Sequence, residues 1–175
     1  PEYYKNLKDV SLPSTLKKIG DYAFENCQYL THIELNEGLE YIGDSAFDGT
    51  NLAEVEIPGS VKKIGESAFE NWLSPSLTKV ILHDGLQEIG KDAFAFQRIK
   101  ICEIPDSVNK IGSSVFLRCV KLQEIRLPQD LSVLETEMFY KCRNLHTIVL
   151  PDSLTKIKAD VFYETGITSL TIPPN

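Results

Sequence analysis

The chain has 175 residues, of which 42% are hydrophobic and 25% charged, and its formal net charge is −7. This composition is typical of a folded domain with a continuous core, and it argues against intrinsic disorder. The acidic balance disfavours nucleic acid as a partner, because a negatively charged body repels the phosphate backbone. The apolar runs are short and the first residues lack the features of a signal peptide, so we expect no membrane insertion in this segment.

Internal repetition is the dominant feature of the sequence. Seven phenylalanines recur at intervals of 22 to 25 residues: Phe24, Phe47, Phe69, Phe94, Phe116, Phe139 and Phe162. A second series with the same rhythm precedes them: Leu7, Leu30, Leu52, Leu77, Ile99, Leu122, Leu145 and Ile167. A unit of this length cannot bury its own apolar face, so successive units must stack and align equivalent residues in columns. We predict a single domain over residues 1–175 with about seven repeats of 22–25 residues, cut within a repeat at both ends.

The first element of each unit is a short strand. In the clearest copy, residues 99–121, Cys102 and Ile104 are two positions apart, and apolar residues occupy the same two slots in the other units. This alternation predicts a strand with one buried face. Pro105 follows directly, and it lacks the N–H that would continue a strand ladder. Each first strand is therefore expected to end at or near this proline.

A second extended passage and a bend complete the unit. Val108 and Ile111 predict that passage, and Gly112 marks the bend after it. The stretch from Gly112 to Phe116 is too short for an independent helix and predicts one helical or 3₁₀ turn. Its Phe side chain is expected to point into the core.

The unit LxxIxIPxSVxxIGxxAFxxC, nearly unchanged in residues 52–72 and 99–119, resembles the BspA-like leucine-rich repeat, also called the treponemal class. The resemblance covers essentially the whole chain. It implies a right-handed, curved solenoid, mainly β with short helical or 3₁₀ turns, and no catalytic residues or cofactors. It also implies a bacterial protein that is secreted or on the cell surface. Glu135 and Lys158 replace the glycine of the bend, and Met138 replaces an alanine, so these repeats are expected to bend differently.

The outward positions of the first strands form our candidate binding surface. Its residues are Glu34, Glu54, Glu56, Lys79, Ile81, Ile101, Glu103, Glu124 and Arg126. Side chains two apart on neighbouring strands share one face, and the glutamates make that face acidic around Ile81 and Ile101, which we expect to be exposed. The alternative is that the charges only protect the sheet and that the isoleucines are ordinary surface residues.

The second passage carries a mildly basic outward column. Its residues are Lys18, Tyr41, Lys63, Glu88, Lys110, Val133 and Lys156. This column is a candidate contact for an anion or a glycan, and the alternative is ordinary solvation of a repeated polar position.

The third repeat contains the one insertion, NWLSPS at residues 71–76, which maps to a loop on one rim. Trp72 in this loop is a candidate recognition residue. The alternative is that Trp72 covers the core, because the same slot holds Cys27 and Cys119 in other repeats.

Cysteine and histidine do not form a site in the sequence. Cys119 and Cys142 lie on adjacent repeats, close enough for a disulfide, although a buried thiol fits this core slot better. His32, His83 and His146 show no metal-binding spacing, and we expect no bound metal, no cofactor and no catalytic residues.

From these features we expect a non-enzymatic scaffold for protein binding or adhesion, exposed on the bacterial surface or secreted. The family resemblance implies that its partner is a host matrix or cell-surface protein. The alternative is a structural spacer that carries another domain of a longer protein.

Overall fold

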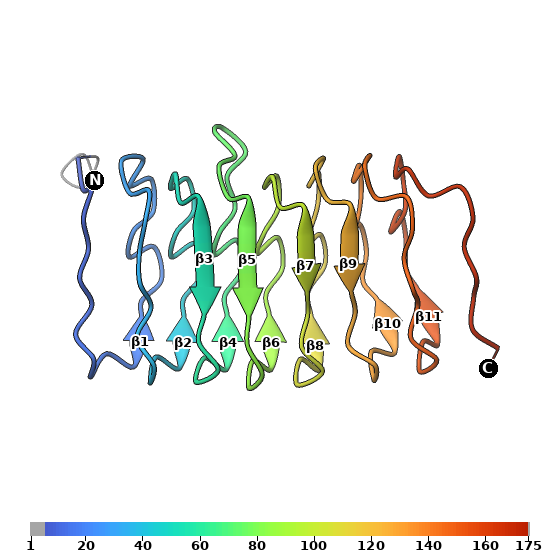
Figure 1. Ribbon diagram of the computed structural model, residues 1–175, viewed down its shortest axis with the longest axis horizontal. Helices are drawn as coiled ribbons and strands as arrows, with labels where there is room; N and C mark the ends of the chain where they lie inside the picture. Colours follow the sequence, from blue (N-terminus) through green and yellow to red (C-terminus); the bar gives the residue numbers. More distant parts are fainter. Residues whose placement is uncertain (1–5, 175) are drawn as a thin grey trace.

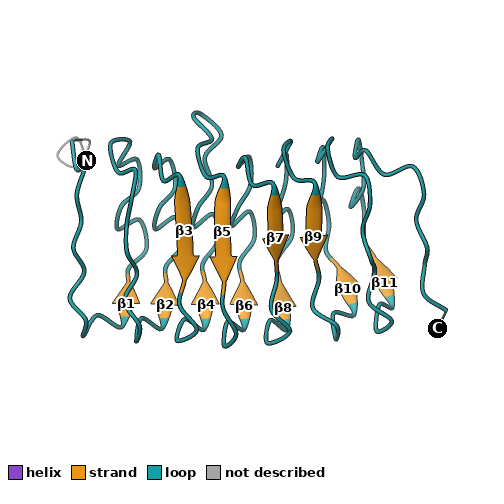
Figure 2. Cartoon of the chain, in the orientation of Figure 1, coloured by secondary structure: helices purple, strands orange, loops and turns teal. Residues whose placement is uncertain are grey.

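The computed structural model describes residues 6–174, which form an elongated β-solenoid (Figure 1). We call each full turn of the solenoid a rung. Every rung contains two extended passages joined by tight turns, and strands make up a small part of the chain (Figure 2). The predicted stacked, mainly β solenoid is confirmed.

The first passages form the face that carries the candidate site. Four of them contain a strand: β3 (Glu54–Ile57), β5 (Lys79–Leu82), β7 (Ile101–Glu103) and β9 (Glu124–Arg126). Strand β3 pairs with β5 and β7 pairs with β9, both in parallel. Val55 lies opposite Val80, and Cys102 lies opposite Ile125, so the buried slots align as the repeat predicts.

The second passages are shorter but pair more continuously. They contain β1 (Lys18–Ile19), β2 (Tyr41–Ile42), β4 (Lys63–Ile64), β6 (Glu88–Ile89), β8 (Lys110–Ile111), β10 (Val133–Leu134) and β11 (Lys156–Ile157). The first five form one parallel sheet in the order β1-β2-β4-β6-β8, whereas β10 pairs with β11 in a separate two-stranded sheet.

Glycine at the bend explains where this second sheet is interrupted. A Cβ added at Gly65 or Gly90 would lie 2.5 Å from the backbone of the preceding rung, so the continuous part of the sheet needs glycine. Glu135 occupies this slot after β10, and its carboxylate binds the Lys158 ammonium at 2.6 Å. The sheet breaks between β8 and β10, where the glycine column ends, although β10 and β11, which are followed by Glu135 and Lys158, still pair with each other.

The turn that carries each Phe differs from the expected helical or 3₁₀ turn, and residues 6–174 contain no helix. Ser114 and Arg118 have positive φ angles of 57° and 55°, which interrupt any helix. The N–H of Leu117 donates to Ser114 within the turn at 3.0 Å, but the N–H of Phe116 donates to Met138 of the next rung at 3.1 Å. Alternate N–H groups thus join neighbouring rungs instead of closing a helix.

The phenylalanine column is the centre of the core, as predicted. Successive rings lie nearly parallel with centroids 5.2 to 6.1 Å apart. The five rings from Phe47 to Phe139 are buried, whereas Phe24 and Phe162 are partly buried. Ile172, expected in a buried strand slot, is exposed because it lies in the last described rung.

Candidate functional site on the strand face

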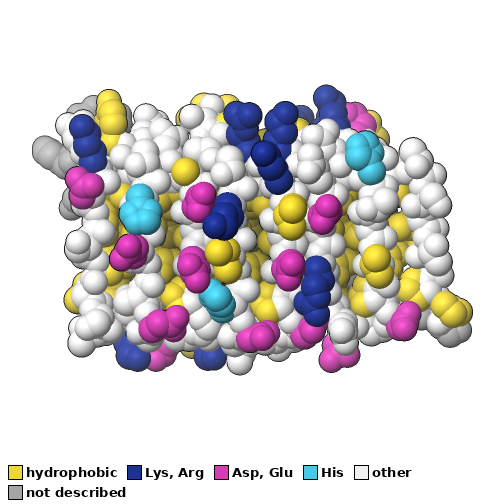
Figure 3. All heavy atoms as spheres, in the orientation of Figure 1, with side chains coloured by type: hydrophobic (Ala, Val, Ile, Leu, Met, Phe, Trp, Pro, Cys, Tyr) yellow, Lys and Arg dark blue, Asp and Glu magenta, His cyan; other side chains and the backbone are white. Residues whose placement is uncertain are grey.

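The structure brings the predicted site residues together on one face of the solenoid, the face shown in Figure 3. Eight of them are exposed: Glu34, Glu54, Glu56, Lys79, Ile101, Glu103, Glu124 and Arg126. The ladder places Glu56 opposite Ile81 and Ile101 opposite Glu124, so each isoleucine has a charged neighbour on an adjacent rung.

The prediction that both isoleucines are exposed is wrong for Ile81. Ile101 is 52% exposed, but Ile81 is half-buried. Two surface hollows flank strand β5: one of about 630 Å³ toward residues 31–37, and one of about 610 Å³ toward β7. Ile81 lines both hollows and Ile101 lines the second. The side chain of Ile81 is therefore recessed between neighbouring rungs.

One pair of charges on this face is neutralised within the chain, and a further carboxylate has a hydrogen-bond partner. The Lys79 ammonium lies 3.4 Å from the Glu54 carboxylate, and His83 Nε2 lies 2.6 Å from Glu56 Oε1. In contrast, Glu103 and Glu124 have no ion-pair partner within residues 6–174. The face is therefore less acidic than its five glutamates suggest.

Arg126 is held in place at the edge of this face. Its guanidinium donates to the Asp106 carboxylate at 2.6 Å and to the Ile104 carbonyl at 3.0 Å. The backbone N–H of Gln129 and the Arg126 guanidinium lower the pKa of Asp106. The strand pattern predicted Arg126 as a site residue but gave no signal for Asp106 or His83, because both residues follow the strands instead of occupying an outward strand position.

The basic column on the second passage is also partly neutralised. Glu88 accepts from Lys110 at 2.9 Å and lies 3.2 Å from the Lys63 ammonium. These two lysines lower the pKa of Glu88, with the hydrogen bond from Lys110 as the main cause. Two of the four lysines in the column are therefore compensated, which weakens it as an anion contact.

The insertion loop places Trp72 in solvent, so the expectation that it covers the core is wrong. Trp72 is 66% exposed and Leu73 is 62% exposed, whereas Asn71 is buried. The Asn71 amide donates to the carbonyls of Thr50 and Ser74 at 2.7 Å and accepts from the Ser74 N–H at 2.9 Å. An indole has one donor and no acceptor, so it could not satisfy these three groups.

The four cysteines are free, buried thiols, which confirms the thiol interpretation over a disulfide. The Cys119 thiol donates to the Phe94 carbonyl, and the Cys142 thiol donates to the Phe116 carbonyl, both at 3.1 Å. Burial raises the pKa of Cys102 and Cys142 to about 12, so these thiols are protonated and unreactive at neutral pH.

The histidines stay on separate rungs, and within residues 6–174 no group of three or more His, Cys, Asp or Glu side chains is arranged to hold a metal ion. The same part of the chain contains no helix with the length and apolar character needed to span a membrane.

Stacked rungs of parallel strands with a repeated leucine and phenylalanine core define a leucine-rich-repeat protein. The family model described as "BspA type Leucine rich repeat region" matches the chain in six copies, over residues 2–94 and 71–175. The chain therefore belongs to the BspA-type leucine-rich-repeat family. This family and fold are typically non-enzymatic scaffolds for protein interaction.

Solved bacterial structures share this fold. A leucine-rich repeat protein from Eubacterium ventriosum is 27% identical, with a TM-score of 0.82 over 91% of this chain and 43% of its own. The T. pallidum leucine-rich repeat protein is 32% identical, with a TM-score of 0.76 over 80% of this chain and 66% of its own. A leucine-rich cell surface protein from Faecalibacterium prausnitzii is 26% identical, with a TM-score of 0.62 over 81% of this chain and 47% of its own.

The chain thus spans less than half of the E. ventriosum protein. No curated protein matches it significantly.

Proposed function

We propose that this chain is a bacterial recognition module, secreted or on the cell surface, that binds a host matrix or cell-surface protein through its strand face. The observation that carries the proposal is the recessed side chain of Ile81 with the exposed Ile101 near it. Ile81 lines two surface hollows of about 630 and 610 Å³, and Ile101 lines the second. Protein ligands commonly anchor an apolar side chain in such a depression and surround it with polar contacts.

The chemistry of the face also supports recognition. The outward column changes from Glu56 to Ile81, then to Glu103 and Arg126, in four successive rungs. Packing of the rungs requires none of these side chains, because the inward slots hold the core. A varied surface on a repetitive frame is the arrangement that solenoid proteins use for extended binding surfaces.

The proposed location rests on relatives. The F. prausnitzii protein with the same fold is described as a cell surface protein. We extend that location to this chain because it belongs to the same family. On the cell surface or outside the cell, the strand face would be accessible to host proteins.

Binding is tested with the double change Ile81→Lys and Ile101→Lys. Both lysines keep a long apolar stem and place the ammonium in water, so the fold should be retained. We expect at least about a tenfold loss of binding to immobilised extracellular matrix proteins and to whole cells, as for loss of an interface anchor. Each variant must keep the circular dichroism spectrum of the parent chain.

Val133→Lys is the control, because it adds one lysine at a partly buried outward position on the second passage, away from the strand face. Binding should be unchanged in this variant. Equal losses in both variants, or unchanged binding in the double variant, would contradict the strand face as the site. A parent chain that binds none of these materials would favour the spacer function.

A further inference from the structure

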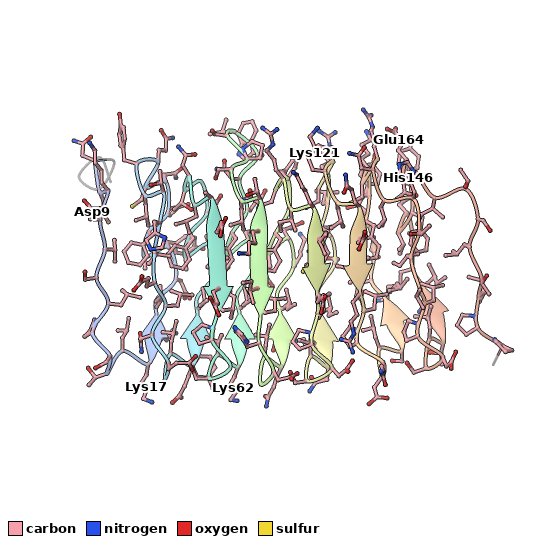
Figure 4. The ribbon with its side chains drawn as sticks, viewed as in Figure 1. Asp9, Lys17, Lys62, Lys121, His146 and Glu164 are labelled. Atoms are coloured by element: carbon pink, nitrogen blue, oxygen red, sulfur yellow. The ribbon has the colours of Figure 1, made fainter. Side chains whose placement is uncertain are left out.

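Cations gather on the rim of the solenoid above strands β5 to β9, where Figure 3 shows a concentration of Lys and Arg side chains. Four exposed cations in this part of the chain are Arg98, Lys100, Arg118 and Lys121, and we call them the rim cations. The Arg118 guanidinium lies 5.9 Å from the centre of the Phe96 ring. Figure 4 labels Lys121 at this rim.

Their positions in the repeat bring three of these residues together. Arg98 and Lys121 each directly precede the first core residue of a unit, so they occupy equivalent positions on adjacent rungs. Lys100 follows Arg98 by two residues, and its carbonyl accepts the N–H of Gln123 on the next rung at 2.8 Å. Side chains from two adjacent rungs, spaced by roughly 4.8 Å, therefore form one patch.

The rim cations have no ion-pair partner within residues 6–174. Carboxylates lie within 4 Å of nine other cations, namely Lys17, Lys63, Lys79, Lys91, Lys110, Arg126, Lys141, Arg143 and Lys158. The sequence contains no Asp or Glu between Asp92 and Glu103, or between Asp106 and Glu124. In a chain of net charge −7, the rim is therefore a local positive region available to an external anion.

This positive region is continuous with the apolar part of the strand face. Lys100 lines the hollow of about 610 Å³ together with Ile81 and Ile101, and Glu54, Lys79 and Glu103 line it as well. Glu54 pairs with Lys79, whereas Glu103 lies further along strand β7, on the side of Ile101 away from Lys100. A ligand that fills this hollow therefore lies beside the rim cations.

We infer that the ligand segment bound at this face is an acidic, apolar peptide. Its apolar side chain contacts Ile81 and Ile101, and its carboxylates face Arg98, Lys100 and Lys121. The inference rests on the proposed function and names the chemistry of the partner. A sulfated glycan would match the cations but has no large apolar group for the hollow, so the combined surface favours a peptide.

The experiment uses the purified chain and three labelled synthetic peptides, followed by fluorescence anisotropy. The first peptide has a Leu-Phe pair followed by three glutamates, the second replaces the glutamates with lysines, and the third replaces Leu-Phe with Ser-Ser. Heparin serves as a polyanion without apolar groups. We expect binding of the first peptide alone, weakened by added salt.

The double change Arg98→Glu and Lys121→Glu should weaken binding of the first peptide at least about tenfold, since it replaces attraction by repulsion. The matched control is Lys18→Glu with Lys156→Glu, which changes the net charge equally on the second passage. This control should leave the affinity unchanged, and Ile81→Lys with Ile101→Lys should weaken it.

Three results would overturn the inference: no binding of the acidic, apolar peptide, equal losses in the rim variant and its control, or equally tight binding of heparin and the Ser-Ser peptide. The proposed function and this inference can be distinguished by their outcomes. If matrix-protein binding is lost with the isoleucine changes but not with the rim changes, the strand face is the site and the acidic ligand chemistry is wrong.

Discussion

The phenylalanine turns and the strand face repeat with the same period, but residue identity is constant in the turns and variable on the strand face. On the turn side, one residue type occurs in every rung, and its rings stack 5.2 to 6.1 Å apart. On the strand face, the outward residue changes from rung to rung, as in Glu56, Ile81 and Arg126. The comparison indicates that the constant columns hold the rungs together, while the variable column is free for recognition.

Charge explains why the outward columns vary. Aromatic rings gain contact energy when they stack, but like charges one rung apart repel each other. On the strand face, the ladder places Lys79 beside Glu54, and the two pair at 3.4 Å. Like charges do occur on adjacent rungs, as at Glu34 and Glu56, and Asp48 on the turn side shows their effect: burial, together with Glu70 and Glu25, raises its pKa to about 6.

The largest expected effect comes from the constant column. Phe116→Ala removes a buried ring between two stacked neighbours and should lower the free energy of unfolding by about 3–5 kcal/mol through lost burial and a cavity. Phe96→Ala removes a half-buried ring outside the column and should cost about 1 kcal/mol. Urea denaturation followed by circular dichroism measures both, and equal losses would show that the column does not dominate the core.

An intermediate effect is expected at Gln97, which is buried between the turn side and the strand face. Its amide donates to the Phe69 carbonyl and accepts the Leu77 N–H at 3.0 Å. Gln97→Ala leaves both backbone groups unsatisfied and should cost about 2–3 kcal/mol in the same denaturation assay. Lys79→Ala, which removes an exposed ion pair, should change stability by less than about 1 kcal/mol. A larger loss at Lys79 than at Gln97 would reverse this order.

The smallest effect concerns pH. The pKa of Asp48 is raised in the folded state from 3.8 to about 6, so the folded chain binds this proton more tightly and loses stability as pH rises from 4 to above 6. Asp48→Asn should therefore raise the free energy of unfolding by about 1 kcal/mol at pH 7, with allowance for partial exposure, and change it little below pH 4. Thermal denaturation across this range tests the sign.

The control for this pH effect is Asp152→Asn, which removes an exposed carboxylate elsewhere. It removes the same charge from the surface and should change the free energy of unfolding by less than about 0.5 kcal/mol at pH 7. An Asp48→Asn variant that is less stable than the parent chain at pH 7 would show that its local hydrogen bonds outweigh the repulsion.

The repeat in the sequence was sufficient to predict the stacked solenoid and most members of its buried columns, with Trp72 and Ile172 as exceptions. Residues such as Phe94, Cys102 and Ile104 are buried where the alternation placed them, because one rung forces the register of the next. The composition of the outward face followed from the same rule, since every slot that is not inward must face solvent.

Features that depend on contacts between particular side chains were decided by the tertiary structure. Asn71 rather than Trp72 is buried because its amide satisfies three backbone groups in the insertion loop. The positive φ angle of Ser114 turns an expected helical segment into bonds between rungs, because backbone donors on adjacent rungs are within reach. Ion pairing also depended on the tertiary structure. Nine Lys and Arg side chains lie within 4 Å of a carboxylate, whereas Lys121 has no such partner within residues 6–174.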